Sequence, residues 1–496
     1  MKSIYDIVIV GAGPVGLTLA NLVAGFGHRV CVLEKEKKLF ASPRAVAVDD
    51  ECLRIWQQTK LLDEMKSFLD SGDEGDEVLT YMDASGRKLM SICQNEKTYG
   101  YPKGAVILQH EIDQILLKGL NRFPKHVDIL FEHEVVDFSQ TKNNITIIAK
   151  HDNKEILVSG KYLVACDGGR STIRKNLGIR MKGFTYPQSW LIIDTIEDRQ
   201  ERKGAQVFCD PAQPIATIPL PKNHRRFEFF LRKKFDPNSF SESDTKAFLD
   251  KVKNFKIKKI LRHLVYTFNA RIAEKYRIGR VFLAGDAAHV TPPFAGQGLA
   301  TGLRDVANLG WKISECLNGN FNDELLDTYE CERRPHQKRM IKLAVMLGRF
   351  MTPRNKIVAF LRGLAMQIVS KIKPLRKMIE LRGQSIQPIY KHGFIKNGNL
   401  AGQYFPQPIL MDGKKQKLFD DLLGNKFTIV SMGLDVKDVL PTNEIQKWKK
   451  MGADFLNVPN DKINLFSEFI DISKKHLFVL RPDRIIYDHR CCHDKG

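Results

Sequence analysis

The stretch YDIVIVGAGPVG, at residues 5–16, decides the fold of this chain. Residues 5–10 form a short apolar run rich in β-branched side chains, which is typical of a buried parallel strand. The glycines that follow, with Pro14 between them, match the pattern G-x-G-x-x-G, and an apolar helical pattern continues to about Gly25. Strand, glycine loop and helix in this order predict a dinucleotide-binding site.

Three glycines and one acid give each part of this motif a role. Gly11 permits the tight turn, Gly13 lets the backbone approach a pyrophosphate, and Gly16 lets the helix pack closely on the strand. A second strand, at 29–33, ends in Glu34, where an acid can bind ribose hydroxyls. A lone G-x-G-x-x-G also fits simple glycine turns, so the prediction rests on the ordered context.

A second informative stretch is RVFLAGDAAHVTPPFAGQGLATGLRDVANLGWKI, at residues 280–313. An apolar strand at 281–284 runs into Gly285 and Asp286, and a loop rich in proline and glycine follows. The next helix begins near Gly298 and presents free N–H groups and a positive dipole end to whatever lies before it. The Asp286 carboxylate can accept hydrogen bonds from a chain of hydroxyls, so this segment indicates a seat for a flavin.

A third segment lies between these two. Residues 161–165 read as a strand, and Asp167 and Gly168 follow it into a helix. An Asp followed by two glycines is by itself an ordinary turn signal. Together, however, the three segments resemble the fingerprints of the class A flavoprotein aromatic hydroxylases, the family of p-hydroxybenzoate hydroxylase and phenol hydroxylase. The resemblance covers about residues 1–345.

Within this family, several stretches resemble the 3-(3-hydroxyphenyl)propionate hydroxylases. They include SPRAVAVDDECLR at 42–54, RRFEF at 225–229 and YECERRPH at 329–336. The resemblance implies an FAD-dependent monooxygenase that uses NADH or NADPH and O₂ to hydroxylate a phenolic ring through a flavin C4a-hydroperoxide. Antibiotic- and quinone-modifying monooxygenases carry the same fingerprints and stay open as alternatives, as does a non-catalytic protein that keeps the FAD fold.

The resemblance also implies which residues contact the cofactor. The expected FAD contacts are Gly11, Gly13, Pro14, Gly16, Glu34, Arg44, Gln109, Asp167, Gly168, Gly285, Asp286, Gly296 and Gly298. No second dinucleotide fingerprint exists in the sequence, so the nicotinamide nucleotide is expected in the groove beside Asp167. Arg170 and Arg174 could position its phosphate, although a solvated helix face explains them nearly as well.

The loop after Asp286 is expected to face the reacting oxygen. Pro292 and Pro293 stiffen it, because proline fixes φ and lacks an N–H, and we predict a catalytic role for both. His289 is a further catalytic candidate, although a structural histidine beside the cofactor is the favoured interpretation. The group that activates the substrate hydroxyl stays open among Tyr186, His289, Asp49 and Asp50. For Asp49 and Asp50, a helix N-terminus is preferred.

The expected fold class is α/β, with a Rossmann-type FAD-binding domain, an inserted mixed or antiparallel β-sheet domain and a thioredoxin-like C-terminal domain without C-x-x-C. Short β-rich runs between 188 and 232 predict the inserted sheet. Its aromatic residues Trp190, Phe208, Phe227 and Phe229 could line a substrate chamber, but most aromatics in such sheets are core. The expected boundaries are 1–180 and 271–345 for the FAD-binding domain, 181–270 for the sheet, 346–392 for basic amphipathic helices and 393–496 for the C-terminal domain.

Composition narrows the remaining choices. The 496 residues are 43% hydrophobic and carry a formal charge of +21, yet no nucleic-acid motif accompanies the lysines. Residues 341–383 alternate apolar side chains with many Lys and Arg and contain one acid, Glu380. Such helices can lie on anionic membranes, but packing on the main body is the preferred interpretation. The nine cysteines are scattered, which favours a reducing cytoplasm and predicts no metal site. A homodimer is also expected, with the C-terminal domain in a structural or dimer-forming role.

Overall fold

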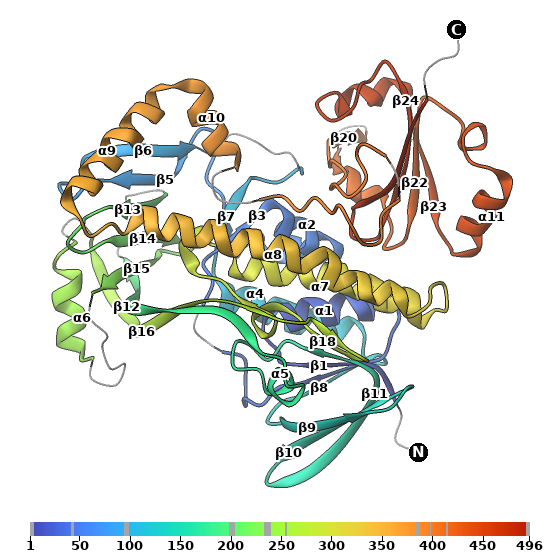
Figure 1. Cartoon of the computed structure of the whole chain (residues 1–496), viewed down its shortest axis with the longest axis horizontal. Coiled ribbons are helices and arrows are strands. Elements are labelled where there is room, and N and C mark those ends of the chain that lie inside the picture. Colours follow the sequence, from blue (N-terminus) through green and yellow to red (C-terminus); the bar gives the residue numbers. More distant parts are fainter. Residues whose placement is uncertain are drawn as a thin grey trace.

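The computed structural model describes residues 4–40, 44–93, 99–197, 204–232, 240–252, 255–382, 386–396, 398–412 and 415–492. Figure 1 shows three parts: a sheet with helices packed on it at the centre, a second sheet on one side, and a C-terminal unit on the other. Among the described residues the two sheets have no strand in common, but the long strands β12 (Met181–Glu197) and β16 (Ile257–Ala273) of the second sheet run back to the central part, so the first two parts form a continuous body.

The first sheet is built around the predicted strand β1. Its strand order is β17-β18-β11-β1-β2-β8, and β1 pairs in parallel with both β2 and β11. Because both faces are covered, these strands are apolar without alternation, and the β1 residues 7–10 are all buried. The strands are β1 (Tyr5–Val10), β2 (Val30–Leu33), β8 (Val127–Leu130), β9 (Glu134–Gln140), β10 (Ile145–His151), β11 (Lys154–Ala165), β17 (Arg277–Ile278) and β18 (Val281–Leu283).

Helices cover this sheet and close its carboxyl edge. Helix α1 follows the glycine loop and packs against α7, where Gly302 and Gly310 leave room for Val15 and Leu19. A three-stranded sheet, β3-β7-β4, lies beside them. The elements are α1 (Pro14–Gly25), β3 (Ala47–Asp49), α2 (Asp50–Gln58), α3 (Leu62–Met65), β4 (Leu69–Asp70), β7 (Gly104–Ile107), α4 (Gln109–Gly119), α5 (Thr172–Asn176), α7 (Gly298–Leu317) and α8 (Glu324–Met351).

The second sheet is the predicted inserted sheet, and it is mixed. Its order is β19-β16-β12-β15-β14-β13-β5-β6, antiparallel except for the parallel pair β13 and β5. Strands β5 and β6 come from the segment that the sequence grouped with the first part of the FAD-binding domain. The elements are β5 (Glu77–Met82), β6 (Lys88–Cys93), β12 (Met181–Glu197), β13 (Ala205–Phe208), β14 (Ile215–Leu220), β15 (His224–Leu231), α6 (Glu242–Leu249), β16 (Ile257–Ala273) and β19 (His289–Val290).

The two faces of this sheet differ in their neighbours. Phe227 and Phe229 are fully buried with Leu249 of α6 and with Val252, on the face away from the central body. Because side chains alternate along a strand, Arg226 and Glu228 lie on the opposite face. Phe227 and Phe229 are therefore core residues, the role expected of most aromatics in such a sheet, whereas Trp190 lines the large cavity between the two sheets.

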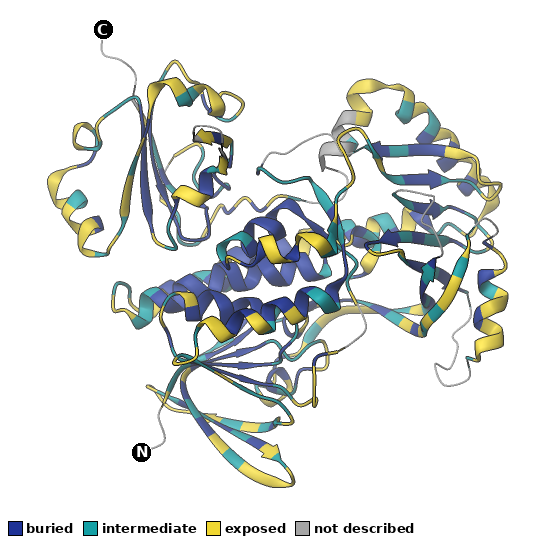
Figure 2. Cartoon of the chain, turned by 180° about the vertical axis from the view of Figure 1, so that it is seen from behind, coloured by how far each residue is buried: buried dark blue, intermediate teal, exposed yellow. Residues whose placement is uncertain are grey.

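Beyond α8, two helices pack on β6: α9 (Lys356–Lys371) and α10 (Lys373–Arg382). The preferred expectation was that their apolar side packs on the main body. For α9 this holds only in part, because Met366 packs in a core cluster with Leu89 and Met90, whereas most of the larger aliphatic and aromatic side chains are exposed. Figure 2 shows this outer face as mostly exposed.

The C-terminal unit contains a four-stranded sheet, β23-β22-β24-β25, with β22 and β23 parallel. Buried ion pairs join it to the central body, with Arg54 binding Asp420 at 2.7 Å and Arg481 binding Glu332 at 2.9 Å. Its likeness to thioredoxin stays a prediction. The elements are β20 (Ile409–Asp412), β21 (Lys415–Leu418), β22 (Thr428–Met432), α11 (Thr442–Lys450), β23 (Asp454–Val458), β24 (Lys475–Leu480) and β25 (Ile486–Cys492). Within the described ranges, no helix is both long and apolar enough to cross a bilayer.

Candidate functional site

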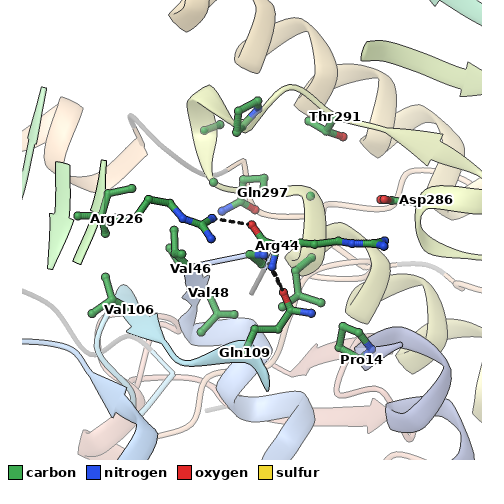
Figure 3. Close-up of a pocket in the computed structure, with 18 of the residues that line it drawn as sticks. Pro14, Arg44, Val46, Val48, Val106, Gln109, Arg226, Asp286, Thr291 and Gln297 are labelled. Atoms are coloured by element: carbon green, nitrogen blue, oxygen red, sulfur yellow. Dashed lines mark hydrogen bonds between the residues drawn. The ribbon is translucent and has the colours of Figure 1, made fainter. Parts of the chain in front are cut away.

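One large cavity lies where the two sheets meet. Its volume is about 2030 Å³, roughly twice the upper end for a pocket that holds one drug-sized ligand. It runs from the glycine loop, past the Gly285 segment, to the inner face of the second sheet. Figure 3 shows side chains of all these regions converging on it. The size and shape suit an extended dinucleotide with a separate small molecule beyond one end.

The glycine loop has the close contacts that the motif requires. Gly11 has φ of +105°, and a Cβ on it would meet the carbonyl oxygen of Cys166 at 2.5 Å. A Cβ on Gly16 would lie 2.1 Å from the carbonyl oxygen of Gly11. Gly13 is the N-cap of α1, and a Cβ there would meet nothing within 4 Å among the described residues. Gly13 and Pro14 line the cavity, so the start of α1 is open to an anionic group.

Glu34 lies at the carboxyl end of β2, beside this loop. Its Oε2 accepts a hydrogen bond of 2.8 Å from the backbone N–H of Ala12, and its Oε1 accepts one from that of Glu36. These bonds fix the carboxylate against the loop while it lines the cavity.

Gln109 holds the backbone that carries Arg44. Its Oε1 accepts hydrogen bonds from the N–H groups of Arg44 and Ala45, at 2.9 and 2.7 Å. From the other side, Arg226 donates to the Arg44 carbonyl at 2.9 Å. Figure 3 shows both contacts and the Arg44 side chain reaching toward Asp286. Gln109 therefore positions the segment beside the cofactor site as well as lining the cavity.

The Gly285–Asp286 turn is held by a buried carboxylate on α7. Asp305 accepts from the N–H of Gly285 at 3.1 Å and from Arg333 at 2.9 Å, and it lies 2.5 Å from His289 Nε2. Burial alone would raise the pKa of Asp305, but His289 and Arg333 outweigh it and lower that pKa. Asp286 is exposed to the cavity, and burial within the surrounding protein raises the pKa of its carboxyl, with His289 and Arg44 opposing the rise.

His289 and Pro292 therefore lie behind the cavity wall. Both are buried, and the cavity is lined instead by their neighbours Thr291 and Pro293. This position supports the favoured interpretation of His289 as structural, through its contact with Asp305. The catalytic assignments of His289, Pro292 and Pro293 stay predictions, and only Pro293 among them reaches the lining.

The loop from Pro293 leads into the amino end of α7. Gly296 adopts a left-handed conformation with φ of +64°, and Gly296, Gln297 and Gly298 all line the cavity. Gln297, the residue before the helix, accepts a hydrogen bond of 3.0 Å from Arg304. The first N–H groups of a 20-residue helix thus face the cavity and would favour a negative charge there.

Asp167 and Gly168 lie where β11 ends. Asp167 Oδ2 accepts from the N–H of Thr172 at 2.8 Å, while its buried Oδ1 has no hydrogen-bond partner among the described residues. Arg174, a candidate for phosphate binding, instead donates to the carbonyls of Ala287 and Gly169 at 2.9 Å each. It therefore ties two cavity loops together, and Arg170 alone of the two arginines is exposed.

The far end of the cavity is an apolar chamber against the second sheet. Its wall combines one face of that sheet with side chains from β3, β7 and the Pro293 loop. The apolar lining includes Val48, Val106, Trp190, Ile192, Ile218, Phe268 and Phe294. Trp190 packs on Phe230, Phe268 and Phe294 with ring centroids 5.2 to 5.6 Å apart. Such a wall fits a planar ring and excludes water around it.

One carboxyl group in this chamber was not predicted. Glu228 on β15 is half-buried and lines the cavity, and within the described ranges its carboxylate makes no side-chain hydrogen bond. Burial raises its pKa, with Arg226 opposing and Asp194 adding to the rise. The nearby cations are engaged elsewhere, since both Arg226 and Arg262 pair with Asp194. Its motif, RRFEF, was noted only as a family likeness, although strand alternation places Glu228 opposite the buried phenylalanines.

The structure separates the other candidates for activating a substrate hydroxyl. Asp49 caps α2 and pairs with the buried Arg304, which confirms its helix-start interpretation. Asp50 lines the cavity, but its buried Oδ2 has no hydrogen-bond partner among the described residues and lies 3.8 Å from Lys103. Burial raises the pKa of Asp50 well above its usual range. Tyr186 is not part of the described lining; it packs on Phe294.

Comparison with known proteins agrees with this site. Residues 4–344 match the family described as FAD binding domain, and residues 402–494 match the HcaD C-terminal domain. The chain is 33% identical over 512 residues to a protein named 3-(3-hydroxy-phenyl)propionate/3-hydroxycinnamic acid hydroxylase from Mycobacterium sp. (strain JLS), covering 97% of this chain and 88% of that protein.

Two solved structures share the fold over almost the whole chain. The flavin-dependent monooxygenase PieE, in complex with FAD and substrate, superposes with a TM-score of 0.82 at 18% identity, covering 99% of this chain and 96% of that one. Aklavinone-11 hydroxylase, with FAD and aklavinone, gives 0.79 at 20% identity and the same coverage. At these identities the likeness shows the fold alone.

A dinucleotide-binding site that opens into an apolar chamber is typical of flavoproteins that act on an aromatic ring. The chain belongs to the FAD-dependent aromatic hydroxylases, the family predicted from its three fingerprints. It is an oxidoreductase with FAD as its cofactor.

Proposed function

We propose that this protein hydroxylates a phenolic compound of the 3-(3-hydroxyphenyl)propionate or 3-hydroxycinnamate type, using O₂ and NADH or NADPH. The observation that carries the proposal is the cavity, in which the cradle for a dinucleotide continues into an apolar chamber that the carboxyl group of Glu228 also lines. The name of the relative that is 33% identical over 97% of the chain supports this substrate class.

The residues around the cradle fit FAD. The close packing at Gly11 and Gly16 leaves space only for backbone, and the start of α1 favours the pyrophosphate. We assign ribose binding to Glu34, the ribityl hydroxyls to Asp286, and the flavin ring edge to the α7 N-terminus beside Gly296 and Gly298. When bound, FAD supplies the redox chemistry with NAD(P)H and O₂, and the chain supplies orientation and a dry site.

The nicotinamide nucleotide is proposed to bind beside Asp167, Gly168 and Arg170. Asp167 lines the cavity and its buried Oδ1 has no hydrogen-bond partner among the described residues, which supports a ligand there. Arg170 is exposed at the same edge and is free of the carbonyl contacts that fix Arg174. Parallel oxidation assays with NADH and with NADPH identify the nucleotide that the protein uses.

Within the chamber, we assign Glu228 as the group that accepts the proton of the substrate hydroxyl. A phenol becomes more reactive at its ortho carbon as its proton moves away, so an acceptor beside the ring promotes hydroxylation. Both Glu228 and Asp50 line the cavity, but the buried Oδ2 of Asp50 lies 3.8 Å from Lys103, which favours Glu228 as the acceptor. Because burial raises the pKa of Glu228, the rate should rise with pH as that carboxyl ionises.

A variant tests this assignment. Glu228→Gln is expected to keep its flavin and KM, to lower kcat about 10²-fold and to lose the ionisation from the acid side of the kcat profile. Glu274→Gln, which alters a half-buried acid outside the cavity lining that pairs with Lys182, is the matched control. An unchanged kcat profile in Glu228→Gln would remove Glu228 from the mechanism.

The function itself is tested by ligand-stimulated NAD(P)H oxidation. Addition of 3-(3-hydroxyphenyl)propionate or 3-hydroxycinnamate is expected to accelerate oxidation and to give a product heavier by one oxygen atom. Bound flavin without stimulation by any phenol would favour an antibiotic- or quinone-modifying relative instead. Absence of both flavin and stimulation would favour a non-catalytic role. A homodimer is likewise proposed and is measured by sedimentation of the same sample.

A further inference from the structure

Helix α9 exposes large apolar side chains on its outer face, whereas a surface helix ordinarily exposes its polar side. The inner side of α9 faces β6. There Gly363 lies against Leu89, and the buried Arg362 donates to the Cys209 carbonyl at 2.7 Å. The outer side carries a stripe at intervals of three and four residues. Its exposed members are Ile357, Phe360, Leu361, Leu364, Ile368 and Ile372. We call this set the α9 stripe.

The stripe is unusually open for residues of this kind. Ile357 and Phe360 keep 69% and 68% of their surface exposed, and Leu361 keeps 55%. Met346 and Phe350, at the end of α8, extend the apolar surface and are also exposed. Contiguous apolar surface of this extent on a globular protein marks an interaction site, whereas single exposed hydrophobic residues do not.

The charge around the stripe is almost entirely positive. Residues 341–383 contain ten Lys or Arg and one acid, Glu380. Arg349, Arg354, Lys356 and Lys371 are exposed at the two ends of the stripe. A second copy of the chain would bring like charges face to face across a two-fold interface, which is unfavourable. An anionic surface with an apolar interior is complementary to both features.

We propose that the α9 stripe docks the protein on an anionic phospholipid membrane, with the apolar side chains entering the headgroup boundary and the basic residues binding lipid phosphates. This goes beyond the proposed hydroxylation and does not depend on it. Lys373, at the start of α10, lines the cavity. Docking would therefore bring one wall of the chamber close to the membrane.

Vesicle flotation of the FAD-loaded full chain tests this inference. Binding is expected to vesicles that contain about one-third phosphatidylglycerol, to fall at least about tenfold on pure phosphatidylcholine, and to reverse in high salt. Ile357→Ser/Phe360→Ser/Leu364→Ser and Arg354→Glu/Lys356→Glu/Lys371→Glu should each weaken binding about tenfold or more.

Matched triple variants elsewhere serve as controls. Leu157→Ser/Leu465→Ser/Ile472→Ser changes three exposed apolar residues, and Lys447→Glu/Lys449→Glu/Lys450→Glu changes three lysines of α11. Both should bind as the unaltered protein does. Equal binding by the stripe variant, or no binding to anionic vesicles, would overturn the proposal. The proposal would also be overturned if the protein were a dimer that dissociates in the stripe variant, because the stripe would then be the interface between two copies of the chain. Flavin content confirms that each variant is folded.

Discussion

Replacing Arg304 with Met removes one cation that holds two helix starts together. Arg304 is fully buried on α7 and pairs with both Asp49 and Glu51 of the α2 start. It also donates to Gln297, at the start of α7. Both helix starts border the cavity. Met fills similar space without charge, so the variant isolates the electrostatic contribution.

The expected loss follows from the groups left behind. Removing one member of a buried ion-pair cluster costs about 3–5 kcal/mol, because the remaining carboxylates stay buried without a counter-charge. For a cooperative unit of the size of the matched 4–344 region, that corresponds to a Tm about 4–7 °C lower. Arg87→Met, which breaks an exposed pair with Asp83, should cost about 1 kcal/mol or less.

The loss should depend on pH with a definite sign. Burial opposes ionisation of Asp49, but Arg304 outweighs it and lowers its pKa below the usual 3.8, so Asp49 adds stability above pH 3.8. Without Arg304, only the hydrogen bond from Cys52 still opposes burial, so we expect that pKa to rise, as burial raises the pKa of Asp50. The variant's deficit should therefore shrink as pH falls from 7.5 to 5. Calorimetry at both pH values measures it. A deficit no larger than that of Arg87→Met, or one that grows on acidification, would refute the reasoning.

Three further predictions concern the cofactor site and the C-terminal unit. Asp286→Ala should weaken FAD binding about 10- to 100-fold in a fluorescence titration, the value of one lost charge-assisted hydrogen bond, and full retention of flavin would contradict the assignment. Gly16→Ala should abolish FAD binding because its Cβ would lie 2.1 Å from a backbone oxygen, while Gly25→Ala, in open space on the same helix, should not. Burial opposes ionisation of Glu332, but Arg481 and Lys312 outweigh it and lower its pKa from 4.5 to about 2. The stability that the Glu332 carboxylate adds is therefore lost as pH falls through that range. Glu332→Gln should make the hydrogen exchange of β24 less dependent on pH in this range, because Gln does not ionise.

Sequence reasoning predicted the FAD-binding half of the fold because its signals are local. The strand, glycine loop and helix at 5–25 and the Gly285–Asp286 segment each contain their own pattern of apolar and turn residues. The cavity lining then includes eleven of the thirteen expected FAD contacts, with Gly16 and Gly285 packed just behind it. Both of these glycines serve close packing, one as predicted and one against Val15.

The chamber was harder to predict because its residues meet only through tertiary structure. Which face of β15 turns inward depends on where α6 packs, so Phe227, Phe229 and Glu228 could not be sorted from sequence alone. The α9 stripe is a case in which the helix could be predicted from the sequence but its environment could not. Its periodicity predicts an amphipathic helix correctly, but periodicity cannot say whether the apolar side meets the protein or lies open.

The most direct test of the account is the fate of O₂ in the complete reaction. With ¹⁸O₂, NADH or NADPH and 3-(3-hydroxyphenyl)propionate, mass spectrometry of the product should show one labelled oxygen atom on the ring and NAD(P)H consumption coupled to it. Flavin-containing protein that consumes NAD(P)H yet forms no labelled ring product from any phenol would contradict the central claim.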